Sequence, residues 1–478
     1  MKRLKPGIPL LAALLIVALA AYNLATNKRF PLTTADSIVP GPDTQWVEAK
    51  TLPPVDVPPA GYHLVDLREV CDQALASYTV RTPGLGDSKP TPEKKTTDAA
   101  AKDEIQWSSI TFSNKKERMA FTTRNSLFIV NMKTKQSIRL HRLTDDDGTE
   151  FFPAIAWSPD DNMVTFGTIT HPKDGGALTY TVSLARVNDG EVKNIHQSDK
   201  RPNLPIWSPD DNYIALDNPL FIYEVKTNNR TPVSMGADLR SPRWSPDSSY
   251  LIFSQYSSPE RCEIYRYAPE TRELLKMTDL GKAVAPMAWL KYPSTIIMET
   301  EVTANGIDTG RHHVGEIRPH SDSSIRWLTG FDSAESNRFL CASPNERLII
   351  LRQYQPAAGA VSTGSKEGPV PAEAGAKVSN SYDLIAANRE ITSFFGWRRV
   401  KLHNLPIDTR FTYAWNRDSK LFYMIDAKSE GTSTADASKY ELYLFDFDQM
   451  TRQKVWTSTT PLRLVAVDGY NTIYYCPY

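Results

Sequence analysis

The residues of this chain that could carry out chemistry are few and scattered. Eight histidines occur among 478 residues, and only His312 and His313 are adjacent. Adjacent residues on a strand point to opposite sides of it, so this pair is badly placed to share a metal ion. His141, His196 and His403 fall near the outer ends of repeated units, where we expect exposed polar side chains. The sequence therefore predicts no metal site.

An acidic run and the cysteines are the other candidates for chemistry. Asp145-Asp146-Asp147-Gly148 lacks the alternating ligands and the terminal Glu of a calcium loop, so a polar turn is the better interpretation. Cys71, Cys262, Cys341 and Cys476 show no Cys-x-x-Cys pair and no metal-ligand spacing. No Gly-x-Ser-x-Gly sequence, the nucleophile turn of serine hydrolases, occurs. We therefore single out no catalytic or cofactor-binding residue.

A short recurring motif indicates the elements on which all these residues must lie. Trp-Ser-Pro-Asp begins at Trp157, Trp207 and Trp244, and an apolar run follows each copy. Proline presets φ, and Asp and Asn form local hydrogen bonds in turns. The runs that follow are rich in β-branched and aromatic residues, as buried strands are. Each copy therefore predicts a strand, a turn and a second strand.

Weaker copies extend the series to eight. Their marker residues are Phe112, Trp289, Ala342, Trp415 and Ala466. Successive markers are 45, 50, 37, 45, 53, 73 and 51 residues apart. Because a propeller blade of four strands takes about 40–50 residues, the chain is predicted to be an all-β propeller. Eight blades are expected, or seven if the terminal copy is an appendage.

The two ends of the chain are predicted to share the last blade. The final copy supplies strands only around Leu464–Val467 and Thr472–Tyr475. Residues 62–67 and 77–80 supply two more strands that have no inner pair of their own. A closed ring must satisfy the hydrogen-bonding edge where it meets itself, and a shared blade does this.

Two cysteines belong to this predicted blade. Cys71 lies between the two N-terminal strands, and Cys476 follows the last strand. Since disulfides persist outside the cytoplasm, we predict a Cys71–Cys476 bridge in an exported domain. Four unpaired cysteines are the alternative. Cys262 and Cys341 are expected to be free and buried.

Residues 1–29 are typical of an export signal, either retained as an anchor or cleaved. A basic start precedes an apolar core over residues 8–25. Three basic residues stand before the core and two after it, which favours a cytoplasmic N-terminus. We expect a single-pass protein of the cell membrane with its domain on the periplasmic or extracellular side, or a secreted domain if the signal is cleaved.

The remainder divides into a tether and one domain. Residues 30–60 contain seven prolines and little periodicity, which predicts a Pro-rich tether. Residues 61–478 form the predicted propeller. The 55 basic and 55 acidic residues of the whole chain cancel, so no nucleic-acid partner is indicated.

The longest insertions fall between the second and third strands of their blades. They are His171–Gly176, Glu301–Arg311, Pro356–Lys377 and Lys428–Lys439. Such connections emerge on the same face as the links between blades, and insertions on one face often mark a binding face. We expect a protein or peptide partner there. Tolerated loop growth is the alternative, above all for 356–377.

The Trp-Ser-Pro-Asp copies resemble the WD40-like repeats of TolB-like β-propellers, over roughly residues 105–478. The same repeats occur in the propeller domains of prolyl-oligopeptidase-like enzymes. The resemblance implies an exported scaffold for protein contacts and no catalytic residue, because the shared motif is structural. A propeller enzyme, a lyase or hydrolase of a small or saccharide substrate that uses the central pocket, is the alternative function.

Overall fold

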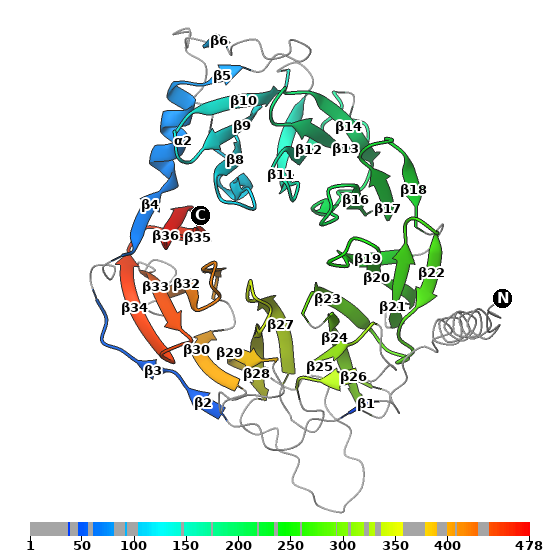
Figure 1. Ribbon diagram of the computed structural model, residues 1–478, viewed down its shortest axis with the longest axis vertical. Coiled ribbons are helices and arrows are strands. Elements are labelled where there is room, and N and C mark those ends of the chain that lie inside the picture. Colours follow the sequence, from blue (N-terminus) through cyan, green and yellow to red (C-terminus); the bar gives the residue numbers. More distant parts are fainter. Residues whose placement is uncertain are drawn as a thin grey trace, which may run out of the picture.

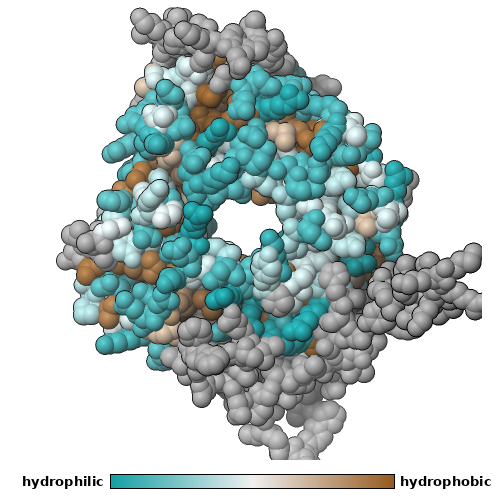
Figure 2. All heavy atoms as spheres, in the orientation of Figure 1, coloured by the Kyte–Doolittle hydropathy of each residue, from teal (hydrophilic) through white to brown (hydrophobic). Residues whose placement is uncertain are grey.

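The structure, a computed structural model, contains eight β-sheets arranged as blades around a central channel (Figure 1). Hydrophilic residues surround the mouth of the channel in the face shown in Figure 2. The structure describes residues 37–38, 46–55, 61–80, 91–92, 104–144, 148–173, 175–217, 219–233, 238–258, 261–292, 294–304, 307–319, 325–329, 336–356, 378–389, 399–406, 409–428 and 439–478. The prediction of an eight-bladed propeller is confirmed.

Blades one to four follow the chain, each with its first strand innermost. Blade one holds β7 (Thr111–Phe112), β8 (Arg118–Thr122), β9 (Ser126–Asn131) and β10 (Ser137–Arg142), after a 3-10 turn at Trp107–Ser109. Blade two holds β11 (Thr149–Trp157), β12 (Met163–Thr170), β13 (Thr179–Arg186) and β14 (Val192–Ser198). Blade three holds β15 (Ile206–Trp207), β16 (Tyr213–Leu216), β17 (Phe221–Glu224) and β18 (Arg230–Pro232). Blade four holds β19 (Asp238–Trp244), β20 (Leu251–Ser258), β21 (Arg261–Ala268) and β22 (Glu273–Lys276).

Blades five to eight complete the ring. Blade five holds β23 (Val284–Leu290), β24 (Thr295–Ala304), β25 (Ile307–Ile317) and β26 (Ile325–Trp327). Blade six holds β27 (Ser336–Ala342), β28 (Leu348–Pro356), β29 (Val378–Asn388) and β30 (Arg399–Pro406). Blade seven holds β31 (Phe411–Trp415), β32 (Leu421–Lys428), β33 (Lys439–Asp446) and β34 (Thr451–Ser458). Blade eight holds β35 (Leu462–Val467), β36 (Thr472–Pro477) and β4 (His63–Asp66).

The hydrophobic core is divided among the seams between consecutive blades. Each of the eight core clusters joins residues of two neighbouring blades. Trp157, Trp207 and Trp244 are 8%, 8% and 7% exposed, and each packs against the preceding blade. The predicted equivalence of the three indoles is confirmed, because the strand that ends at each Trp is the innermost one of its blade.

The motif also ties the blades to one another. The residue after its Asp, such as Asp161 at φ 65°, takes the left-handed conformation, which Asp tolerates. The Asp161 carboxylate accepts hydrogen bonds from the main-chain N–H groups of Asn114 (2.6 Å) and Lys115 (3.0 Å) in blade one. Asp211 likewise accepts from the N–H of Asp160 at 3.1 Å. These turns therefore hydrogen-bond one blade to the next, in addition to joining the first two strands of each blade.

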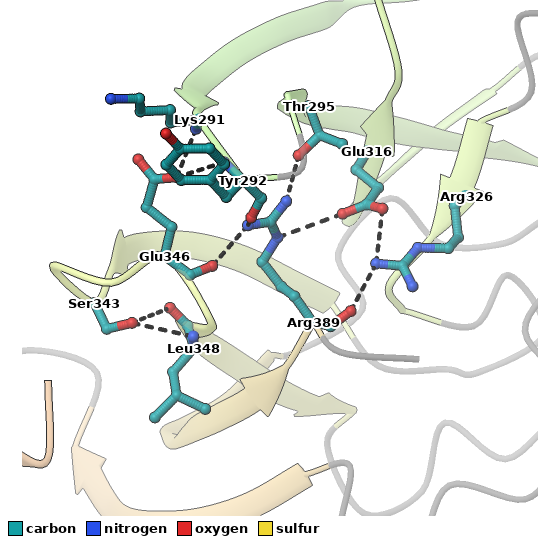
Figure 3. Close-up of polar contacts among 9 residues, drawn as sticks. All are labelled: Lys291, Tyr292, Thr295, Glu316, Arg326, Ser343, Glu346, Leu348 and Arg389. Carbon is teal, nitrogen blue, oxygen red and sulfur yellow. Dashed lines mark hydrogen bonds and ion pairs between the residues drawn. The ribbon is translucent and has the colours of Figure 1, made fainter. Parts of the chain in front are cut away.

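One seam, between blades five and six, contains a buried ion network (Figure 3). Glu316 on β25 is 2.7 Å from Arg326 and 3.5 Å from Arg389, which follows β29. Arg389 also donates to the Thr295 hydroxyl and to the Glu346 carbonyl. Burial lowers the pKa of the Arg389 guanidinium. Because Arg389 of blade six contacts Glu316 and Thr295 of blade five, the network joins the two blades.

The shared blade is confirmed for one N-terminal strand and wrong for the other. β4 joins blade eight, as predicted, and pairs in parallel with β36. The strand expected over 77–80 is β5 (Thr79–Val80), which pairs instead with β10 of blade one and with β6 (Thr91–Pro92). Between them, helix α2 (Leu67–Ala76) buries Leu67, Val70, Cys71 and Ala74 on the seam between blades eight and one. The helix carries the chain across that seam, so β5 reaches the next blade.

An N-terminal strap, defined here as β1 (Ser37–Ile38), β2 (Trp46–Glu48) and β3 (Lys50–Thr51), follows the outside of the ring. Its strands pair in parallel with the outer strands of blades five, six and seven (Figure 1). With β4 and β5, five consecutive blades carry a strand from the N-terminal segment; we call them the strapped half. Blades two, three and four, the bare half, end at β14, β18 and β22 among the described strands.

The strap falls within residues 30–60, for which the sequence predicts a tether, and no local pattern indicated the pairing. The apolar core predicted over residues 8–25 lies outside the described residues. Among the residues that the structure describes, no helix has the length and apolar character needed to cross a membrane.

Candidate functional site

Blade three is much shorter than its neighbours. Its strands have 2, 4, 4 and 3 residues, against 9, 8, 8 and 7 in blade two. β11 and β15, the inner strands of blades two and three, both end at the motif Trp. The shorter β15 therefore lacks the first part of an inner strand. Pro202 and Pro205 stand in that position and have no N–H for a ladder. Because β16, β17 and β18 are short, only 37 residues separate Trp207 from Trp244.

A cavity of about 1230 Å³ lies at the shortened end of blade three. The end of β14 and the link to β15 form one side, with residues 197–200 and 203–204. The turn between β16 and β17 contributes Asp217 and Leu220, and the opposite wall is Leu239–Arg243 of β19. The links between blades and the second-to-third-strand connections meet here, on the face where the sequence predicts a partner.

Asp217 fixes one side of the cavity. Its carboxylate is buried and accepts hydrogen bonds from the main-chain N–H of Asn203 (2.8 Å) and from the Asn203 amide. These bonds hold the link between blades two and three where a strand would otherwise lie. Leu204, next to Asn203, is 52% exposed. The link therefore presents an apolar side chain on a backbone that Asp217 anchors.

The β19 wall is irregular and carries two arginines. The register with β20 shifts between Arg240 and Arg243, and Ser241 has φ 57°. Arg243 donates to the carbonyls of Met287 (2.9 Å) and Pro242 (2.7 Å), and burial lowers its pKa. The Arg240 guanidinium lies 4.5 Å from the centre of the Tyr256 ring. Hydrogen bonds thus hold Arg243 in place, and the contact with the Tyr256 ring holds Arg240.

The two cysteines of the predicted bridge lie in one core cluster. Cys71 is on α2 and Cys476 on β36, both are fully buried, and both are thiols in the structure. Burial, and to a lesser degree the neighbouring Cys476, raises the pKa of the Cys71 thiol. The bridge stays a prediction. Cys262 and Cys341 are also thiols, the first buried and the second half-buried.

The histidines differ from expectation in their exposure. His196 and His403 are 5% and 8% exposed, because the next blade packs against one face of the outer strand that carries each. His196 packs 4.7 Å from the Phe221 ring, and His403 packs 4.5 Å from the Tyr443 ring. Their predicted placement at exposed positions was wrong; His141 is half-buried.

The His312-His313 pair lies on β25. The His313 ring is buried beside Thr329 (3.2 Å), whereas the His312 ring lies 2.6 Å from Arg338. Within the described ranges, no three His, Cys, Asp or Glu side chains lie close enough together to hold a metal ion. The acidic residues 145–147 lie outside those ranges.

The predicted insertions have mixed outcomes. Residues 171–178 connect β12 and β13, as expected. Glu301–Arg311 is wrong as a loop, because most of it extends β24 and β25 into a longer hairpin. Residues 357–377 and 429–438 lie outside the described residues. No pattern in the sequence singles out Asp217, Asn203 or Leu204.

The comparisons with known proteins concern the fold. No protein-family model matches the sequence, and no curated protein matches it. TolB from Acinetobacter baumannii is 14% identical, with a TM-score of 0.35 over 90% of this chain and 98% of that one. An oligogalacturonate lyase from Vibrio parahaemolyticus is 12% identical, with a TM-score of 0.44 over 77% and 88%. A prolyl endopeptidase is 14% identical, with a TM-score of 0.48 over 74% of this chain and 50% of that one.

Proposed function

We propose that this protein is an exported, membrane-tethered propeller that binds a segment of a partner protein in the cavity at blade three. The observation that carries the proposal is the missing end of that blade. Packed sheets lie about 10 Å apart, so removing part of one blade leaves room for one layer of polypeptide between its neighbours. The cavity, about 1230 Å³, is also larger than the roughly 300–1,000 Å³ of typical small-molecule pockets.

The lining offers both kinds of contact that a peptide needs. Leu204, which is 52% exposed, provides apolar area. Leu220 and Leu239 are buried in the seam core behind the lining. The amide of Gln197 and the hydroxyl of Ser241 provide polar groups beside it. Buried apolar contact surrounded by polar groups is the usual composition of a protein-binding patch.

The test is selection of peptides on the full chain from a random 15-residue library. We expect binders whose affinity falls at least ~10-fold in Leu204→Asp, because a charge replaces exposed apolar area at the cavity. Tyr470→Asp is the matched control, since Tyr470 is an 84% exposed apolar residue in a turn of blade eight. If every selected peptide binds Leu204→Asp as well as the parent, the cavity is not the binding site.

Export and tethering are part of the proposal and are supported by residues 1–29. If residues 8–25 cross the membrane, 26–36 are the whole link to β1, because β1 already pairs with blade five. Eleven extended residues span at most about 40 Å, so blade five would stay near the bilayer. Protease added to spheroplasts should digest the propeller; full protection behind an intact membrane would contradict this orientation.

A further inference from the structure

We propose that the partner segment that enters the cavity continues along the outer edge of β14 as an added parallel strand. The inference rests on the proposed function, because it takes the cavity as the place where the segment ends. It specifies the partner as an extended polypeptide with an acidic side chain opposite Lys193. Three observations support it.

The first observation is that this chain already adds strands to its own blades in this way. β1, β2 and β3 pair in parallel with the first residues of β26, β30 and β34. β5 does the same on β10, from Ile138. In this fold, a short extended segment can therefore pair in parallel with the edge at the start of an outer blade strand.

The second observation is that β14 has the same form and carries no such strand among those described. It is the last strand of its sheet, and its seven residues exceed the three of β18 and the four of β22. A bulge disturbs its pairing with β13 between Val182 and Ser183. Bulges of the same kind occur at β10, β30 and β34, which nevertheless accept strands. An edge strand directs main-chain N–H and C=O groups outward, so β14 offers a ladder of them.

The third observation is that β14 leads into the cavity. The strand runs from Val192 to Ser198, and residues 197–200 line the cavity. A parallel segment on Val192–Gln197 would cover about 20 Å and leave the edge at the cavity. One continuous polypeptide can thus occupy both places without a turn.

Lys193 gives the added strand a charge preference. Lys193 and Asn194 are exposed on this strand. In the strap, Glu48 stands opposite Lys401 in the same parallel arrangement, and the Lys401 ammonium itself lies 2.9 Å from Asp383 of the adjacent strand. Opposite charges across a strand pair stabilise it, so an acidic residue facing Lys193 is the corresponding choice.

The experiment uses peptides selected on the full chain from the same random library. Hydrogen exchange followed by mass spectrometry should show slower exchange over residues 192–197 when peptide is bound. Ile138 and Arg139 of β10 are the internal control, because β5 already pairs with them and their exchange should not change. Two sets of peptides are N-methylated at alternate residues, one at the odd positions and one at the even positions (the two N-methylation phases). Their affinities should differ by at least ~10-fold, because only every second N–H faces β14.

Charge substitutions test the preference. Lys193→Glu should weaken acidic peptides by about fivefold, and a Glu→Lys peptide should recover affinity for that variant. Lys133→Glu, an exposed lysine in a turn of blade one, is the matched control and should have no effect.

The outcomes separate the two proposals. Binding that depends on Leu204 but leaves exchange at 192–197 unchanged, with both N-methylation phases equal, would overturn the added strand and leave the cavity proposal intact. Binding that is indifferent to Leu204 would overturn the cavity proposal. Dependence on Leu204 together with protection of 192–197 supports both.

Discussion

The strapped half and the bare half are built from the same repeat but differ at their edges. In the strapped half, five blades carry a strand from the N-terminal segment. In the bare half, β14, β18 and β22 are the outermost described strands, and blade three has lost part of its sheet. An open edge invites pairing with other chains, so proteins usually cover or shorten it. Here the strapped half is covered, and the candidate site lies in the half that is not.

The seams, in contrast, are alike in both halves. Every pair of neighbouring blades encloses a hydrophobic cluster. Trp207 in the bare half and Trp289 in the strapped half are both 8% exposed, and Trp415 of blade seven is half-buried. Packing between blades therefore does not distinguish the halves. The difference lies in main-chain edges and strand ends, which is where binding by strand addition takes place.

The largest effect is expected from opening the ring in the strapped half. Removing residues 464–478 deletes β36 and most of β35, and with them the partner of β4 and part of two core clusters. We expect the cooperative melting transition to disappear. A fragment that starts at Gly61 lacks only β1 to β3 and should keep the transition at a lower midpoint. A truncated protein that melts like the parent would show that blade eight does not close the ring.

Substitution of the indoles tests whether the seams are alike. Trp157→Ala, Trp207→Ala and Trp244→Ala in the bare half, and Trp289→Ala in the strapped half, should each cost about 3–5 kcal/mol of unfolding free energy. Urea denaturation measures this, with Tyr470→Ala as an exposed control. A markedly smaller cost at Trp207 than at Trp289 would mean that the shortened blade packs more loosely.

The predicted Cys71–Cys476 bridge would strengthen the strapped half alone. It would close a loop of about 400 residues and add stability toward the upper end of roughly 2–5 kcal/mol. Non-reducing mass spectrometry of the exported protein should find the two peptides linked. Recovery of both cysteines alkylated without reduction would remove the bridge but not the shared blade.

The smallest effect is expected at the hydrogen bonds that join the turns of neighbouring blades. Asp161→Ala removes the acceptor for the N–H groups of Asn114 and Lys115 and puts Ala at φ 65°. The expected cost is about 1–3 kcal/mol. Asp161→Asn keeps one acceptor oxygen and a residue that tolerates this conformation, so its cost should be clearly smaller. Equal melting points for the two variants would contradict the role given to the carboxylate.

The sequence by itself determined the repeat and its local chemistry. Pro159, Asp160 and the apolar run from Met163 specify turn and strand through interactions within a few residues, so periodicity and spacing predicted the blades and their number. The buried Trp positions followed for the same reason, since the turn fixes which strand is innermost. The interval of 37 residues recorded the short blade, although its consequence, a cavity, was not evident in one dimension.

Tertiary structure alone decided where distant segments meet. The pairing of Trp46 with Arg399 and of Lys50 with Thr451 joins residues about 350 to 400 apart in the sequence. A strand of two or three residues is too short for its sequence pattern to predict the strand with which it pairs. α2 packs on a seam made from both ends of the chain, and His196 is buried only because blade three covers it. The cavity arises in the same way, from what blade three lacks beside two complete neighbours. Such contacts depend on the closed ring, because local sequence specifies an element but not the surface against which it will pack.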